Sequence, residues 1–346
     1  MDNKSFYEFV LANKGQMTWE EIGKHYNMSG ESARCKWKRK RSKSNNSNWQ
    51  AKSKWEVKTK EGKETLYSWK YTPVNETYFD DFLTELKELN VDKPNIFIES
   101  SDSKYCAVIG STDLHLGNTG DLNKQIEYVK EIFYKTFNRL AIYAPEKVYL
   151  IVGSDNLDLD GYNNTTTRGT PRTPSANWHV IFKEAIKLYI EVISSLSEEV
   201  FVEVVVLPGN HDETLSLALG DVLEAYFTHN VNVHVNNRAE EPRKVVMYYD
   251  NLFAFAHGDK GKLRDLPIMI ASRFPSQWGL SKTRYFFTGH LHHQYTQEIQ
   301  GNQIVVLPSI APEDTWHKEK GYLSNKIMQT WIFHRHDGCE AIFNVK

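Results

Sequence analysis

Polar side chains that can bind metal ions recur at the ends of apolar runs in this sequence of 346 residues. Residues 204–207 form one such run, and Asn210, His211 and Asp212 follow it closely. Four other apolar runs are followed by Asp113 and His115, by Asp155 and Asp158, by His257 and Asp259, and by His290 and His292. A single cluster of this kind is usually a surface turn or a helix cap. Five clusters at equivalent places predict one shared site.

The donor types indicate which metal chemistry such a site would have. Imidazole, carboxylate and amide donors without a thiolate are typical of Mn, Fe, Zn or Ni. The candidate ligands are Asp113, His115, Asp155, Asn210, His257, His290 and His292. They exceed the four that one tetrahedral ion needs, and two ions sharing a carboxylate are typical of phosphatases and nucleases. We therefore predict two divalent cofactor ions, with Mn²⁺ as the first choice.

Strands and helices alternate from about residue 104, and they must position these side chains. The first strands are expected at 105–112, 147–154 and 200–209, with amphipathic helices at 122–144, 176–196 and 214–227. Strands predominate after residue 230. This order predicts an α/β fold, a two-sheet β-sandwich flanked by helices, over residues 104–346. In open α/β sheets, ligands bind at the carboxyl ends of the strands, where all five clusters would meet.

The N-terminal part has a different charge from the rest. Residues 1–70 contain 16 Lys or Arg and 8 Asp or Glu, whereas the whole chain has a net charge of −2. Thr18 and Glu21 fit a capping box, and Ser29 can cap a second helix. Two short helices, the second basic, resemble a small helix-turn-helix domain over residues 1–41. Its expected DNA contacts are Arg34, Lys36, Lys38, Arg39, Lys40 and Arg41. The alternative is a basic helix that only aids solubility.

The remaining segments have no predicted catalytic role. Residues 42–54 are polar and of low complexity, which is typical of a linker. Residues 55–103 are predicted to contain a β-hairpin around Glu61-Gly62 and an amphipathic helix, as a structural connector. The sequence has no signal-peptide pattern, no stretch near the roughly 20 apolar residues of a membrane span, and no CxxC pair. These features predict a cytoplasmic protein without a membrane partner, and they do not identify a protein partner.

Five motifs occur in a familiar order: Asp113-x-His115, Gly153-Ser-Asp155, Gly209-Asn210-His211-Asp212, His257-Gly258 and Gly289-His290-Leu-His292. Across residues 104–310, this set resembles the calcineurin-like metallophosphoesterase superfamily, in particular its DNA-repair exonuclease branch.

The resemblance implies a role for each motif residue. The first ion would be bound by Asp113, His115 and His292. The second would be bound by Asn210, His257 and His290, and Asp155 would bridge both. His211 would be the general acid at the leaving oxygen, and Asp212 would orient its ring. A hydroxide held between the ions would attack phosphorus in line.

Two features leave alternatives open. The family usually has Gly-Asp-x-x-Asp at the second motif, but here Ser154 separates Gly153 from Asp155, so Asp158 is an alternative bridge. The long polar segment 161–173 carries Arg168 and Arg172, which can contact a substrate phosphate. A surface loop without a substrate role is equally consistent with that segment.

The predicted reaction is two-metal hydrolysis of phosphodiester bonds, with DNA as the substrate and the protein acting as a nuclease. The basic N-terminal segment favours this hypothesis because it suits an anionic partner. A phosphatase or phosphodiesterase for small molecules or phosphoproteins is the alternative. A DNA-binding regulator without activity is disfavoured, because no class of ligand is missing from the motifs.

Overall fold

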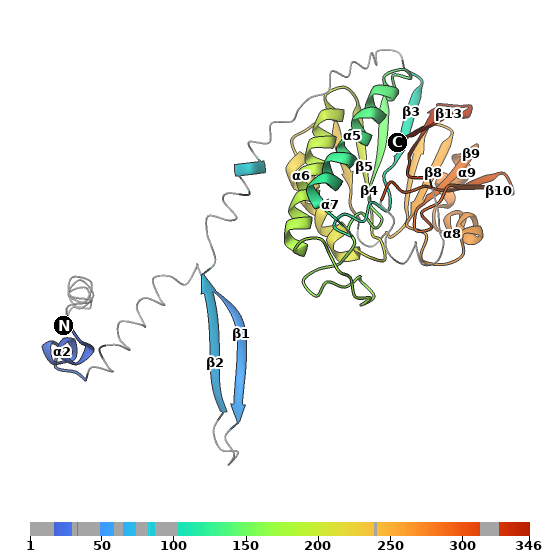
Figure 1. Cartoon of the computed structure of the whole chain (residues 1–346). Coiled ribbons are helices and arrows are strands. Elements are labelled where there is room, and N and C mark those ends of the chain that lie inside the picture. The colour runs from blue at the N-terminus through green and yellow to red at the C-terminus, as the bar shows by residue number, and fades with distance from the viewer. Residues whose placement is uncertain are drawn as a thin grey trace. The chain divides into compact units, whose positions relative to one another are not determined.

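The computed structural model describes residues 17–29, 33, 49–58, 65–73, 82, 84–86, 103–118, 120–238, 241–311 and 325–346. The chain divides into two compact units, Met1–Glu88 and Leu89–Lys346. Figure 1 shows the elements of each unit, and each unit is considered by itself. The predicted DNA contacts between Arg34 and Arg41 lie outside the described residues. Among the described residues, none of the helices combines the length and the apolar character needed to cross a membrane.

Helix α2 (Trp19–His25) in the first unit begins with the predicted capping box, which is confirmed. The Glu21 carboxylate accepts a hydrogen bond from the Thr18 amide at 2.7 Å, and the Thr18 hydroxyl accepts one from the Glu21 amide at 3.4 Å. Ile22 and Ala33 are buried together beside Tyr26. This contact stabilises a short helix that would be marginal alone.

Strands β1 (Trp49–Lys58) and β2 (Thr65–Pro73) pair antiparallel as a hairpin. A hairpin was predicted in this region, but β1 begins earlier, inside the segment 42–54 that was predicted to be a linker. The polar composition of that segment hid the strand, because polar residues lower the apparent β-propensity without preventing backbone pairing.

The second unit contains a six-stranded sheet in the order β13-β12-β3-β4-β5-β6. Its strands are β3 (Tyr105–Gly110), β4 (Lys147–Gly153), β5 (Phe201–Leu207), β6 (Val233–Asn236), β12 (Met328–His334) and β13 (Gly338–Val345). Strands β3 to β6 are parallel, so their carboxyl ends share one edge. Helices α5 (Leu122–Leu140), α6 (Trp178–Ser197) and α7 (Glu213–Phe227) connect them and lie together in Figure 1.

A second, five-stranded sheet has the order β10-β11-β9-β8-β7. Its strands are β7 (Lys244–Tyr248), β8 (Asn251–Ala256), β9 (Thr283–Thr288), β10 (Tyr295–Ile299) and β11 (Asn302–Val306). Short helices α8 (Leu266–Arg273) and α9 (Pro275–Leu280) follow β8, after the 3-10 turn Leu263–Asp265. The sequence patterns predicted neither these helices nor β10.

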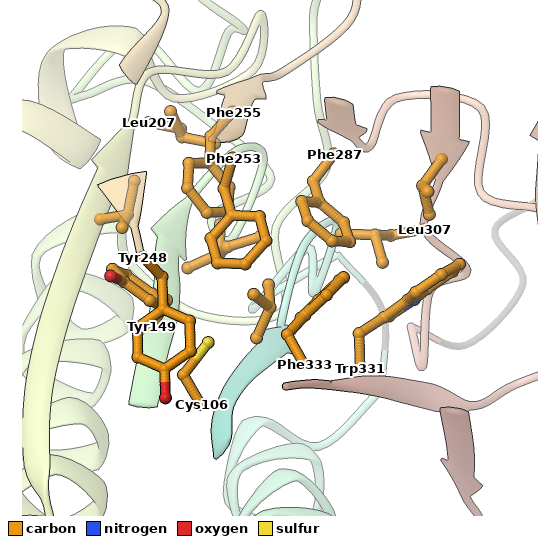
Figure 2. Close-up of a cluster of buried hydrophobic side chains, with 14 residues drawn as sticks. Cys106, Tyr149, Leu207, Tyr248, Phe253, Phe255, Phe287, Leu307, Trp331 and Phe333 are labelled. Carbon is orange, nitrogen blue, oxygen red and sulfur yellow. The ribbon is translucent and has the colours of Figure 1, made fainter. Parts of the chain in front are cut away.

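The main core lies between the two sheets (Figure 2). Alternate residues of β8 show why the strand is apolar throughout. Phe253 and Phe255 face the core between the sheets, whereas Leu252 and Ala254 pack with Leu266 of α8 on the other side. The predicted α/β sandwich flanked by helices is confirmed, and it holds the strand ends in fixed positions.

Candidate metal centre

The loops after β3 and β4 run side by side beyond the ends of their strands. The Asp113 amide donates to the Ser154 carbonyl at 2.8 Å, and the His115 amide donates to the Asp155 carbonyl at 3.0 Å. The parallel pairing of the two strands thus continues into the two motifs. As a result, residues of the two motifs lie side by side at the carboxyl edge of the sheet.

Two motif glycines permit close approach to carboxylates. A Cβ at Gly209 would collide with Asp155 Oδ1, and a Cβ at Gly289 would collide with Asp113 Oδ2. Glycine is therefore required where the loops after β5 and β9 pass these acidic side chains.

The backbone is strained at five of the candidate ligands. Positive φ angles occur at Asp113 (55°), His115 (44°), Asp155 (62°), His290 (68°) and His292 (56°). Such angles are uncommon outside glycine and cost free energy. They cluster at functional sites, where the surrounding structure imposes them.

The first donor cluster contains Asp113, His115 and His292, with one ligand atom from each within 4.8 Å of the others. Nε2 of His115 lies 3.1 Å from Nε2 of His292, and Asp113 Oδ1 lies 3.3 Å from the same His292 nitrogen. Nδ1 of His115 lies 3.1 Å from Asp158 Oδ1. A carboxylate behind a ring nitrogen is the usual arrangement for a metal-binding imidazole.

The second donor cluster contains Asp155, His257 and His290, again within 4.8 Å. Nε2 of His257 lies 2.8 Å from Asn210 Oδ1 and 3.1 Å from Asp155 Oδ2. The Ser154 hydroxyl lies 2.9 Å from Nδ1 of His257. The structure thus brings all seven predicted ligands into two adjacent groups.

These residues fit a pair of cations. The Nε2 atoms of His115 and His292 face each other. A cation bound between them would accept both lone pairs. Asp113, Asp155 and Asp158 are each at most 1% exposed. Buried carboxylates require positive charge nearby, from a paired side chain or a bound ion.

His115 of the first cluster and His257 of the second have pKa values shifted in opposite directions. Burial lowers the pKa of His115. Burial acts in the same direction on His257, but the Asp155 carboxylate outweighs it and raises the pKa of His257 to about 9. His257 therefore attracts a proton, and a bound cation would take that proton's place.

His211 lies at the edge of the first cluster, with its ring edge-on to His115 and the centroids 4.6 Å apart. Its Nδ1 lies 3.3 Å from Asp158 Oδ1, a contact that is an ion pair when the ring is protonated but not a hydrogen bond. Burial would lower the pKa of His211, but contact with the Asp158 carboxylate raises it. His211, His115 and Asp158 also form a third group of possible ligands.

Asp212 has different partners from those predicted. Its carboxylate accepts hydrogen bonds from the amides of Asp155 at 3.2 Å and Leu157 at 2.9 Å. Burial, followed by repulsion from Asp155, raises the pKa of Asp212 to about 7. The prediction that Asp212 orients the His211 ring is therefore replaced: Asp158 faces that ring, and Asp212 braces the loop after β4.

The loop 160–172 is fixed to the rim of the centre. Arg172 donates two hydrogen bonds to the Asp158 carboxylate, at 2.8 and 2.7 Å. Arg168 Nη2 donates to Asp259 Oδ2 at 2.7 Å, and its side chain is 63% exposed. Both arginines were predicted to contact substrate phosphate, but the structure pairs both with carboxylates. Only Arg168 keeps a guanidinium that is largely open to solvent.

Sequence reasoning missed several supporting residues. Asp160 accepts hydrogen bonds from the amides of Thr214 at 3.1 Å and Leu215 at 2.9 Å, so it caps α7 from a distant loop. Ser154 contacts His257, and the Ser309 hydroxyl donates to the Asp113 carbonyl at 2.6 Å. No local sequence pattern predicts these roles, because each residue contacts a partner that is remote in the sequence.

The sequence matches no family model, and no curated protein is significantly similar to it. Among solved structures, the fold is similar to that of an archaeal phosphodiesterase, with 15% identity and a TM-score of 0.34 over 70% of this chain and 99% of that one. A zinc-bound Vps29 from Entamoeba histolytica has 13% identity and a TM-score of 0.32 over 69% and 96%. The purple acid phosphatase PPD1 of yellow lupin seeds has 12% identity and a TM-score of 0.33 over 84% and 58%. Similarity at this level does not identify a reaction.

Proposed function

We propose that this protein is a phosphodiesterase that uses two divalent metal ions, Mn²⁺ in the first instance, to hydrolyse DNA. The observation that carries the proposal is the convergence of the two donor clusters at the strand ends. Asp113, His115 and His292 would hold one ion. Asn210, His257 and His290 would hold the other, with Asp155 between them. Two bound ions would supply Lewis acidity for attack of water on a phosphoester.

His211 has the properties of a general acid for this reaction. Contact with Asp158 favours the imidazolium form of the ring, and 21% exposure of the side chain leaves it open to a substrate. With Nδ1 facing Asp158, Nε2 is the nitrogen left to give a proton to the leaving oxygen. Arg172 holds Asp158 in place through both hydrogen bonds, which fixes the orientation of the carboxylate that faces His211.

The choice of DNA rests on the N-terminal segment. The capped helix α2 and the contact of Ile22 with Ala33 support a folded module there, and residues 34–41 are strongly basic. A basic module would tether the catalytic unit to a polyanion.

The test is hydrolysis by the purified full-length protein with Mn²⁺. Labelled single-stranded and double-stranded DNA, RNA and bis-p-nitrophenyl phosphate are offered in parallel, and bound metal is measured by elemental analysis. We expect two equivalents of metal, cleavage of DNA and slower cleavage of the generic diester. Cleavage of bis-p-nitrophenyl phosphate without cleavage of DNA or RNA would instead support the alternative of an enzyme for small phosphoesters. A protein that binds no divalent ion would overturn the proposal.

A further inference from the structure

A small, partly open pocket adjoins the second donor cluster. Its lining includes Pro208, Arg243, His257, Asp259, Lys260 and Lys262, and we call it the basic pocket. It shares His257 with the metal centre, and Pro208 belongs to the loop that carries Asn210. Anything bound in it would therefore lie next to a substrate held at the ions.

The charges around the basic pocket are mainly positive. Its acidic member, Asp259, is paired with Arg168, at 2.7 Å. Lys260 Nζ lies 3.2 Å from Glu213 Oε2, but both side chains are at least 40% exposed, so this pair is weak and easily exchanged. Lys262 is exposed and has no charged partner among the described residues. The lining thus contains three cations, Arg243, Lys260 and Lys262, and one carboxylate, Asp259, on a chain whose net charge is −2.

A hydrogen bond links Arg243 to the turn that lines the basic pocket. Arg243 Nη2 donates to the Lys260 carbonyl at 3.0 Å, which fixes the guanidinium under the turn Gly258–Lys262. Gly258 and Gly261 both have positive φ angles, 110° and 94°, so the turn bends sharply around the pocket. In the described part of the chain, the amides of Asp259 to Lys262 donate to no acceptor. The ammonium groups of Lys260 and Lys262 and the Arg243 guanidinium form a favourable environment for an oxyanion.

We propose that the basic pocket receives a second phosphate group of the substrate, one removed from the phosphoester at the metal centre. This inference rests on the proposed function and specifies its substrate class. Two chemistries supply such a group: the next phosphodiester of a nucleic-acid strand, and the next phosphate of a polyphosphate chain. A simple diester such as bis-p-nitrophenyl phosphate supplies neither.

The test compares a thymidine dinucleotide that carries a terminal phosphate with the same dinucleotide without it. We expect the full-length protein with Mn²⁺ to prefer the phosphorylated form by about tenfold in kcat/KM, since hydrogen bonds to charged groups have this magnitude. In the double variant Lys260→Ala with Lys262→Ala, the preference should fall to about one. Hydrolysis of bis-p-nitrophenyl phosphate should be unchanged, because that substrate has no second phosphate.

Lys282→Ala is the matched control. Lys282 is 72% exposed and pairs with Asp250 at 2.7 Å beside the amino end of β9, the end opposite to His290. The substitution removes one surface charge at a site that is not part of the basic pocket. It should keep the full preference for the phosphorylated dinucleotide.

A binding measurement separates failure of the pocket from failure of the proposed function. Calorimetry in EDTA with the phosphorylated dinucleotide, and separately with adenosine triphosphate, requires no hydrolysis. About tenfold weaker binding by the double variant supports the basic pocket, and the ligand that loses affinity identifies the source of the phosphate. Equal binding of both dinucleotides by the wild-type protein, with no loss of triphosphate binding in the double variant, would overturn the inference even if hydrolysis is observed. Absent hydrolysis with intact pocket binding would instead reject the proposed function alone.

Discussion

The two donor clusters of the metal centre use the same kinds of ligand but differ in their surroundings. Charged side chains support the first cluster. Asp158 contacts His115 and His211, and Arg172 donates hydrogen bonds to Asp158. Behind the second cluster stands the neutral Ser154 hydroxyl, and the basic pocket opens beside it. We propose that proton transfer takes place on the side of the first cluster and that substrate anions are anchored on the side of the second.

The largest effect is expected at Asp155, because both clusters depend on it. Its carboxylate contacts His257, and its backbone carbonyl holds the His115 amide. Asp155→Asn keeps the shape but removes the charge. Hydrolysis of bis-p-nitrophenyl phosphate should fall by more than the roughly 10²–10³-fold loss typical of one preorganised electrostatic contact. Metal content, measured by elemental analysis, should also fall.

The matched variant for this experiment is Asp158→Asn. It should retain both ions, since Asp158 faces the back of His115 rather than its Nε2. If Asp158→Asn loses metal while Asp155→Asn keeps it, the bridge is at Asp158 and the assignment of the second motif is wrong.

His211→Ala should give the next largest effect. Loss of a general acid costs about 10²–10⁴-fold, so DNA cleavage should fall by this factor while both ions stay bound. A substrate with a p-nitrophenol leaving group should lose less, because that group departs without protonation. Rates on both substrates and the metal content are measured together. Loss of an ion from this variant would make His211 a ligand, as its grouping with His115 and Asp158 also allows.

Arg172 tests the charged surroundings of the first cluster. Arg172→Ala removes both hydrogen bonds to Asp158, and removal of such a supporting interaction typically lowers activity about 10–100-fold. We expect the loss of activity in Arg172→Ala to appear as a lower kcat, with KM unchanged. Arg172→Lys should restore little, because a lysine cannot make two parallel bonds to a carboxylate. A rise in KM with unchanged kcat would return Arg172 to the substrate-binding role that the sequence predicted.

The smallest effect on catalysis is expected from the N-terminal segment. Every residue of both clusters lies beyond residue 103, so deletion of residues 1–48, which ends just before β1, should leave hydrolysis of bis-p-nitrophenyl phosphate unchanged. Affinity for duplex DNA should decrease. The slope of log K against log salt should become shallower by about 0.9 for each DNA phosphate that the segment neutralises. Titrations at several salt concentrations measure this. Equal slopes before and after deletion would mean that the segment is not a DNA tether.

Much of the second unit could be predicted from the sequence because its signals are local. The apolar runs that became β3, β4, β5 and β8 are buried almost throughout, β9 is buried in its second half, and their polar ends follow directly. The capping box of α2 spans only Thr18 to Glu21 and could be read from residue types. By contrast, four of the five residues of β10 are exposed, so no apolar alternation announced this strand.

The pairing of side chains was decided by the tertiary structure alone. Sequence order placed Asp212 beside His211, but the fold turns Asp212 toward the amides of Asp155 and Leu157 and brings Asp158 to the His211 ring. Arg172 was predicted at a substrate and lies on Asp158. In each case the partner is decided by which strand ends are adjacent in the sheet.

The sequence by itself therefore determined which side chains stand at the strand ends, since hydrophobic periodicity and residue type are properties of short segments. The tertiary structure decided which of these side chains face each other, which arginines are already paired, and that a basic pocket adjoins His257. Those outcomes depend on contacts between residues separated by up to 177 positions, such as His115 and His292. Contacts of that kind arise only when the two sheets are packed and their carboxyl ends lie together.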